Sequence, residues 1–164
     1  MVSFTFGVSS FFYTPSVGIG AEMSFEEKSA WIMGLVAVSS YGVYLAIILG
    51  LARSIPLVEV PYVAPLLWTI GASIVASIAL NILMGIFSPR DAGKKDQRDR
   101  EIYRFGEYIG QSFLVIGGVA VLLMAMVETD HFWIANVIYL AFFLSAILGS
   151  VAKIVAYRRG FQPW

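Results

Sequence analysis

The chain has 164 residues, of which 59% are hydrophobic and 13% are charged. Soluble domains usually carry about 25% charged residues, so this composition excludes an ordinary soluble domain and a disordered chain. Eleven Lys and Arg residues balance eleven Asp and Glu residues, and the net charge alone therefore indicates no partner. Because the sequence contains no cysteine, disulfides, thiol catalysis and thiolate metal sites are excluded.

The N-terminal segment, residues 1–22, differs from the rest of the chain. It contains several aromatic residues but no Lys or Arg and no unbroken apolar run. It is therefore not predicted to be a secretory signal. We expect a disordered, dispensable leader, followed by a membrane domain over residues 23–164. Ser24 is predicted to cap the first helix, with Glu26 and Glu27 in its first turn.

Four stretches are long and apolar enough to cross the roughly 30 Å hydrocarbon core of a bilayer. They cover about residues 30–52, 62–87, 108–127 and 132–157. None of them shows the alternation of apolar and polar residues that a membrane barrel strand requires. We therefore predict an all-α integral membrane protein whose four transmembrane helices form a bundle.

The positions of Lys and Arg set the orientation of such a protein, because these residues favour the cytoplasmic side. With four spans both termini lie on one side of the membrane. That side would hold ten of the eleven basic residues, and the other side would hold only Arg53. Both termini are therefore predicted to be cytoplasmic.

The second loop is rich in charge, and residues 94–107 have the pattern of a helix that continues into the third span. The third helix is thus predicted to extend into the cytoplasm. Three pairs at i,i+3 spacing could each stabilise it by about 0.2–0.5 kcal/mol. These pairs are Arg98 with Glu101, Glu101 with Arg104, and Arg104 with Glu107.

Arg98, Arg100, Glu101 and Arg104 are candidates for a docking surface that binds a cytoplasmic partner or anionic lipid headgroups. The simpler interpretation is a solvated extension that anchors the third span. Acidic residues are interleaved with the basic ones, which argues against a pure lipid site and against direct binding of nucleic acid.

Small and polar residues recur at helical spacing inside the spans. They are Ser73, Ser77, Asn81 and Gly85 in the second span, Gly106, Gly110, Gln111, Gly117 and Gly118 in the third, and Ser145, Gly149 and Lys153 in the fourth. Small residues allow transmembrane helices to approach closely, and polar ones form hydrogen bonds between helices. We therefore expect these positions to mark helix contacts. Alternatively, Ser73, Ser77, Asn81 and Gln111 line a polar path.

Groups for catalysis or ion coupling are scarce. No Asp or Glu lies in the central part of any span, where proton-coupled carriers usually need one. Lys153 is close enough to the end of its span for its head to reach the interface. The one histidine, His131, could form a metal or acid–base site at the outer rim with Glu128 and Asp130. Capping of the fourth helix by Asp130 or Thr129 is the favoured interpretation. We predict no enzyme, no cofactor and no resident metal.

Two stretches, residues 94–113 and 130–161, resemble an uncharacterised family of small four-span bacterial membrane proteins. In that family a D-x-R-D-R-E-I string precedes the third span, and residues 96–102 supply it here. A Y-R-R-G string follows the fourth span, and residues 157–160 supply it. The resemblance implies a location in the cytoplasmic membrane of a bacterium and a sensing or immunity-type role.

The sequence thus predicts a non-catalytic integral membrane protein that acts as an accessory, sensory or immunity-type component. It would work through protein or lipid contacts, as a homo-oligomer or as a subunit of a membrane complex. The alternative is a small transporter or channel subunit that works as an oligomer.

Overall fold

Four long helices account for most of the residues that the computed structural model describes, 25–87 and 97–159. They are α1 (Phe25–Leu51), α2 (Val63–Phe87), α3 (Gln97–Met126) and α4 (His131–Arg159), and a short 3-10 helix, η1 (Leu57–Glu59), precedes α2. All four are long and apolar enough to cross a membrane, which confirms the prediction of an all-helical, multi-pass membrane protein. The expected leader, the expected cap Ser24 and residues 94–96 of the charged segment lie outside the described residues.

Helix α3 joins the charged segment to the third span without a break. It begins at Gln97 and runs for 30 residues, which corresponds to about 45 Å. This length exceeds a hydrocarbon core of about 30 Å, so such a core cannot contain the whole helix. The charged residues of α3 lie in its first turns, and these are the turns expected outside such a core.

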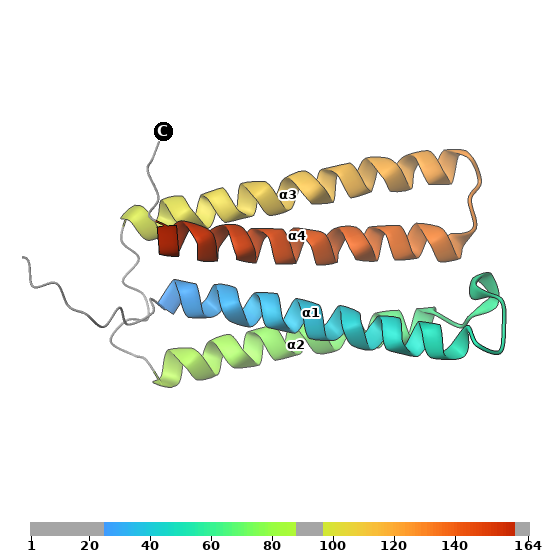
Figure 1. Cartoon of the computed structure of the whole chain (residues 1–164), viewed down its shortest axis with the longest axis horizontal. Helices are drawn as coiled ribbons and strands as arrows, with labels where there is room; N and C mark the ends of the chain where they lie inside the picture. Colours follow the sequence, from blue (N-terminus) through green and yellow to red (C-terminus); the bar gives the residue numbers. More distant parts are fainter. Residues whose placement is uncertain (1–24, 88–96, 160–164) are drawn as a thin grey trace, which may run out of the picture.

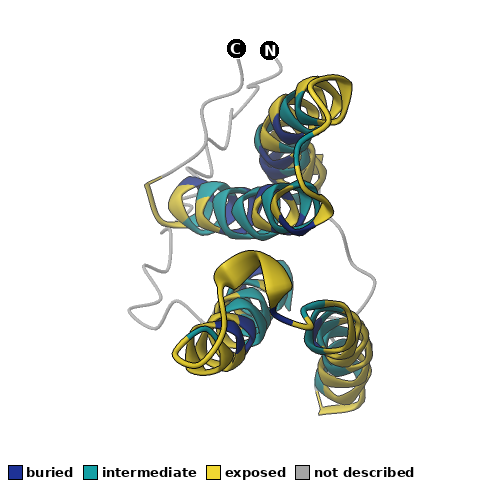
Figure 2. Ribbon diagram, turned by 90° about the vertical axis from the view of Figure 1, so that its right-hand side faces the viewer, coloured by how far each residue is buried: buried dark blue, intermediate teal, exposed yellow. Residues whose placement is uncertain are grey.

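The four helices lie side by side in the spatial order α3, α4, α1, α2 (Figures 1 and 2). Helix α4 packs against both α3 and α1, and α1 in turn packs against α2. Helix α2 packs mainly on α1, and it meets α4 at the hydrogen bond between Tyr139 and Thr69. No residue in the most apolar part of α2 is buried by the rest of the protein. Most of α2 is therefore left for lipid or for another chain.

Helices α3 and α4 approach closely because α3 places three buried glycines against α4. A Cβ atom on Gly106 would lie 2.9 Å from the carbonyl oxygen of Gly149, and one on Gly110 would lie 2.9 Å from that of Ser145. A Cβ atom on Gly117 would meet the Cβ atom of Ala141. The expected small-residue contacts are thus confirmed between these two helices, whereas Gly85 and Gly118 face open space.

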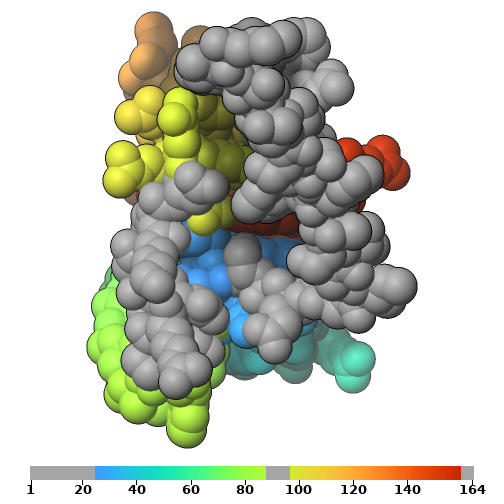
Figure 3. Space-filling view, turned by 90° about the vertical axis from the view of Figure 1, so that its left-hand side faces the viewer, coloured from blue at the N-terminus to red at the C-terminus, as the bar shows by residue number. Residues whose placement is uncertain are grey.

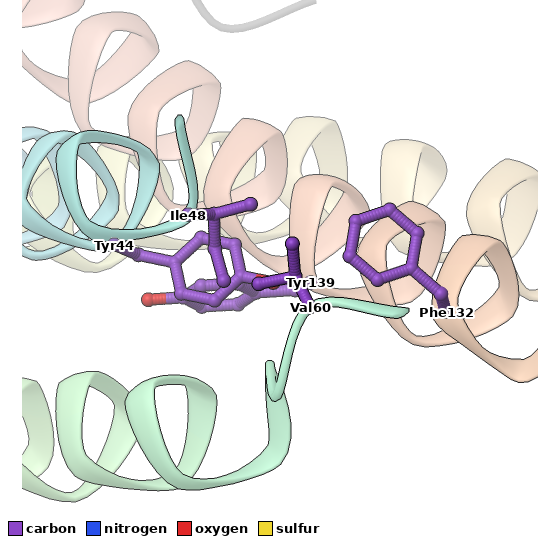
Figure 4. Close-up of a cluster of buried hydrophobic side chains, with 5 residues drawn as sticks. All are labelled: Tyr44, Ile48, Val60, Phe132 and Tyr139. Carbon is purple, nitrogen blue, oxygen red and sulfur yellow. The ribbon is translucent and has the colours of Figure 1, made fainter. Parts of the chain in front are cut away.

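A cluster of buried apolar side chains joins α1 to α4 at the end of the molecule where α1 ends and α4 begins, near the loop that carries η1 (Figure 4). Its members are Tyr44, Ile48, Val60, Phe132 and Tyr139. Val60 follows η1, so the loop itself contributes a side chain to this core. The rings of Tyr44 and Tyr139 meet edge to face, with centroids 4.9 Å apart.

A tight turn connects α3 to α4. Glu128 adopts a left-handed conformation with φ of 55°, and the amide of Thr129 donates a 2.9 Å hydrogen bond to the carbonyl of Met124. This arrangement terminates α3 in the way that glycine more often does. The Asp130 carboxylate then accepts a 2.9 Å hydrogen bond from the amide of Phe132, which confirms the predicted cap of the fourth helix.

The neighbouring glycines Gly117 and Gly118 test the α3–α4 packing. Gly117→Ala should lower the free energy of unfolding by about 1–3 kcal/mol, because its Cβ atom would force α3 away from Ala141. Gly118→Ala adds the same atom into open space and should change that free energy by no more than about 0.5 kcal/mol. Unfolding in mild detergent, followed by circular dichroism, compares the two. Equal effects would contradict the packing.

Candidate functional site

Charged side chains gather where α1 and α3 begin and α2 and α4 end. This is the left end of the molecule in Figure 1, and Figure 3 views the molecule from that end. Some of them form contacts between helices, and others have no partner among the described residues. This difference separates structural charges from those available for function.

Lys153 is the most deeply buried of these charges, with 7% of its surface exposed. Its Nζ atom lies 2.7 Å from Oε1 of Glu107 on α3 and 4.1 Å from the ring centroid of Tyr103. The aliphatic stem of the lysine occupies the space that a side chain on Gly106 would need. The head was expected to reach the interface by itself. Instead it lies between α4 and α3, where its charge is balanced.

Two further contacts connect α4 to its neighbours. The Arg158 Nε atom donates a 3.3 Å hydrogen bond to Glu27 of α1, and the guanidinium lies 5.7 Å from the ring centroid of Trp31. The Tyr157 hydroxyl donates a 3.0 Å hydrogen bond to Asp99 of α3. The charged end of α4 is thus attached to both α1 and α3.

The predicted docking residues behave differently. Arg98, Arg100 and Arg104 are exposed and Glu101 is half-buried, and none of the four forms an ion pair or hydrogen bond with another described residue. The expected i,i+3 pairs along α3 are therefore not formed. Glu107, which was expected to pair with Arg104, pairs with Lys153 instead.

Gln111 extends this set of unpaired polar groups along α3. It is exposed, has no hydrogen bond to a described residue, and follows Arg104 by seven residues, or about two turns. The positions between and beyond them, Tyr108 and Val115, are 73% and 65% exposed. We call this surface, opposite the glycines that contact α4, the outer α3 face. It comprises Arg100, Arg104, Tyr108, Gln111, Val115, Gly118 and Leu122.

The polar residues of α2 lie elsewhere and are mostly engaged. The Ser29 hydroxyl of α1 donates a 2.7 Å hydrogen bond to the Asn81 side chain, whose Nδ2 atom donates to the carbonyl of Ser77 at 2.8 Å. The Ser73 hydroxyl donates to the carbonyl of Ile70 at 2.8 Å. The structure does not bring Gln111 together with Ser73, Ser77 and Asn81, because α3 and α2 lie at opposite ends of the row of helices.

A hydroxyl network that the sequence did not reveal connects α1, α2 and α4. The Tyr139 hydroxyl donates a 3.1 Å hydrogen bond to Oγ1 of Thr69, and the Ser40 hydroxyl donates to the carbonyl of Thr69 at 2.9 Å. The Tyr44 hydroxyl donates to the side chain of Asn136 at 2.7 Å. The sequence does show hydroxyl and amide side chains inside uncharged spans. It does not show which of them bond to each other, because the partners are distant in sequence.

Beside this network lies a groove of about 390 Å³ between α1, α2 and α4. Apolar side chains form most of its wall, and four of the residues that line it carry a hydroxyl group: Ser40, Tyr41, Ser73 and Tyr139. None of the described residues that line it is charged. The groove can therefore accommodate a neutral, mainly apolar molecule.

The outer-rim residues Glu128, Asp130 and His131 lie in and next to the α3–α4 turn. Asp130 is engaged in capping α4, and Glu128 has the conformation that ends α3. Within residues 25–87 and 97–159, no group of three His, Cys, Asp or Glu side chains is arranged to hold a metal ion. The structure therefore supports a role of Glu128 and Asp130 in the geometry of the turn, and His131 is the first residue of α4.

Comparison of the chain with protein-family models, curated proteins and solved structures gives no match. The resemblance to the four-span bacterial family therefore stays a prediction. What the protein does has to be inferred from its own residues.

Two glutamates on α3 provide a matched test of the Lys153 contact. Glu107→Gln should lower the free energy of unfolding by about 1–2 kcal/mol, because it removes the countercharge of a buried ammonium. The loss is moderate because Glu107 is itself 44% exposed and its charge is screened. Glu101→Gln has no pair to break and should change stability by less than about 0.5 kcal/mol. Equal stability of the two variants in detergent would contradict this role of Glu107.

Proposed function

We propose that the chain is a non-catalytic integral membrane protein that acts as an accessory, sensory or immunity-type component by binding another membrane protein. The outer α3 face is the surface that makes the contact. The partner is a second copy of the chain or a different subunit of a complex.

The proposal rests on a difference between two groups of charged residues at this end of the molecule. Lys153, Arg158 and Glu107 take part in contacts between helices, whereas Arg100 and Arg104 of the outer α3 face have no partner among the described residues. Since those two arginines contribute nothing to the packing of the chain, their charges are available to acidic groups of a partner. Charge-assisted hydrogen bonds of this kind are stronger than neutral ones.

Gln111 favours a protein partner over lipid headgroups. It lies about 10 Å further along α3 than Arg104, toward the apolar part of the helix. An amide that faces hydrocarbon lacks the hydrogen bonds that water would supply, and polar side chains in membranes are usually paired across helices. Because an amide both donates and accepts, the Gln111 of a second copy would also satisfy it.

The orientation we propose has both termini, and hence the charged start of α3, on the cytoplasmic side of a bacterial cytoplasmic membrane. The distribution of Lys and Arg supports this orientation, since ten of eleven lie on one side. The partner's acidic groups would then lie at or near the cytoplasmic surface.

Because the chain has no cysteine, single cysteines can test the orientation directly. An impermeant thiol reagent added to intact cells should label Thr129→Cys and should not label Gly93→Cys until the membrane is opened. Labelling of Gly93→Cys in intact cells would overturn the orientation. The proposal for the outer α3 face would survive that result, but its charged part would be placed outside.

Charge reversal tests the docking surface. The double variant Arg100→Glu and Arg104→Glu should lose the partner on affinity purification from native membranes in mild detergent and should then have the mass of the single 18.0 kDa chain. Arg159→Glu is the matched control, because Arg159 is exposed at the same end but lies on α4. Light scattering and mass spectrometry of the purified material measure the complex.

The control variant should retain the partner, and both variants should keep the helical content of the unchanged chain. A complex that survives reversal of both arginines would contradict the proposal. Loss of the partner in Arg159→Glu as well would indicate a general effect of charge at this end, which would also contradict a specific role of α3.

The alternative function is that of a small transporter or channel subunit. It would require a connected polar path along Ser73, Ser77, Asn81 and Gln111. The geometry supports it less, because Asn81 is bonded to α1 and Gln111 lies on the opposite side of the row of helices.

A further inference from the structure

The groove between α1, α2 and α4 contains one hydroxyl that differs from the others. The hydroxyls of Ser40, Ser73 and Tyr139 all form hydrogen bonds with neighbouring protein groups. Tyr41 also lines the groove, but its hydroxyl has no hydrogen bond to any described residue. The Tyr41 side chain is half-buried, and a tyrosine hydroxyl that is withdrawn from water usually has such a partner.

The Tyr41 ring is held in place by its neighbours. It stacks on Phe143 with centroids 4.3 Å apart and an interplanar angle of 12°, and it meets Tyr139 edge to face at 5.4 Å. The hydroxyl lies on the axis of the ring, so rotation of the ring does not move it toward another acceptor. The Tyr41 hydroxyl is therefore held in one position, and no described residue accepts a hydrogen bond from it.

Tyr41 lies near the middle of a membrane span, where water is scarce. The residue lies about 24 Å from the start of α1 and about 15 Å from its end, which is about 5 Å from the middle of the helix. A hydroxyl at this depth is surrounded by hydrocarbon, where an unpaired donor is costly. A ligand with an acceptor oxygen would remove this cost.

The same depth distinguishes between two sources of that oxygen. Ester carbonyls of phospholipids bound the hydrocarbon core and so lie about 15 Å from its middle, roughly 10 Å from the level of Tyr41. A free carbonyl compound dissolved in the bilayer can reach that level directly. Since none of the described residues around the groove is charged, a charged ligand would find no counterion.

We propose that this groove is a binding site for an uncharged, lipid-soluble carbonyl compound whose oxygen accepts a hydrogen bond from Tyr41. The volume of about 390 Å³ lies in the range of small-molecule sites, and apolar contacts come from Ile74, Phe142 and Ala146. The ring of Phe143 holds Tyr41 in position. This site goes beyond the proposed function and does not depend on it, because the outer α3 face is on a different helix.

Benzophenone is a suitable probe, because it is neutral, carries one carbonyl and crosslinks to nearby C–H groups under light. An alkyne-tagged benzophenone should label the full chain in lipid nanodiscs in a saturable manner. Peptide mapping should locate the label on Ile74, Phe142 or Ala146. Fluorenone should compete about tenfold better than fluorene, which has the same flat frame but no carbonyl.

Two tyrosine variants isolate the hydroxyl. Tyr41→Phe keeps the ring and should weaken saturable labelling about tenfold. Tyr44→Phe removes a neighbouring hydroxyl that is bonded to Asn136 and does not line the groove, and it should leave the labelling within about twofold.

Equal competition by fluorenone and fluorene in the unchanged chain would overturn the proposal without the need for any variant. Labelling that is not saturable, or that maps outside the groove, would overturn it as well. So would undiminished labelling of Tyr41→Phe. These outcomes leave the docking proposal for α3 intact, since they concern neither Arg100 nor Arg104.

Discussion

The close approach of α3 to α4 is the contact on which the rest of the arrangement depends. Because Gly106, Gly110 and Gly117 lack side chains, the backbone of α4 can lie against that of α3. The same approach brings the stem of Lys153 across Gly106 and its head to Glu107. It also determines which side of α3 is turned away from the protein, and thereby defines the outer α3 face.

Polar groups in this protein are either satisfied within the chain or located where another molecule can reach them. Among the described residues, no fully buried side-chain nitrogen or oxygen atom lacks a hydrogen bond. The unpaired groups on which the two proposals rest are Arg100, Arg104 and Gln111 of the outer α3 face and the hydroxyl of Tyr41 beside the groove. In a bilayer an unpaired polar group has few alternatives to a bound partner, and for this reason we place the two proposed sites at these positions.

The sequence was sufficient to predict the helices, because length and apolar character identify a span without any knowledge of its neighbours. The glycine spacing in α3 also predicted a helix contact, although not which helix forms it. The peripheral place of α2 could not be predicted, since all four spans have the same mean hydropathy. The pairing of Lys153 with Glu107 joins positions that are 46 residues apart, and no local pattern indicates it.

Contact between the outer α3 face and another protein is the central claim, and photo-crosslinking in living cells tests it most directly. A photoreactive phenylalanine analogue at Tyr108, a position 73% exposed on that face, should form a discrete adduct with a second protein chain. The same analogue at Phe87, 82% exposed on α2 at the same end of the molecule, should give no such adduct. Failure of Tyr108 to form a protein adduct, or an identical adduct from Phe87, would contradict a specific contact through α3.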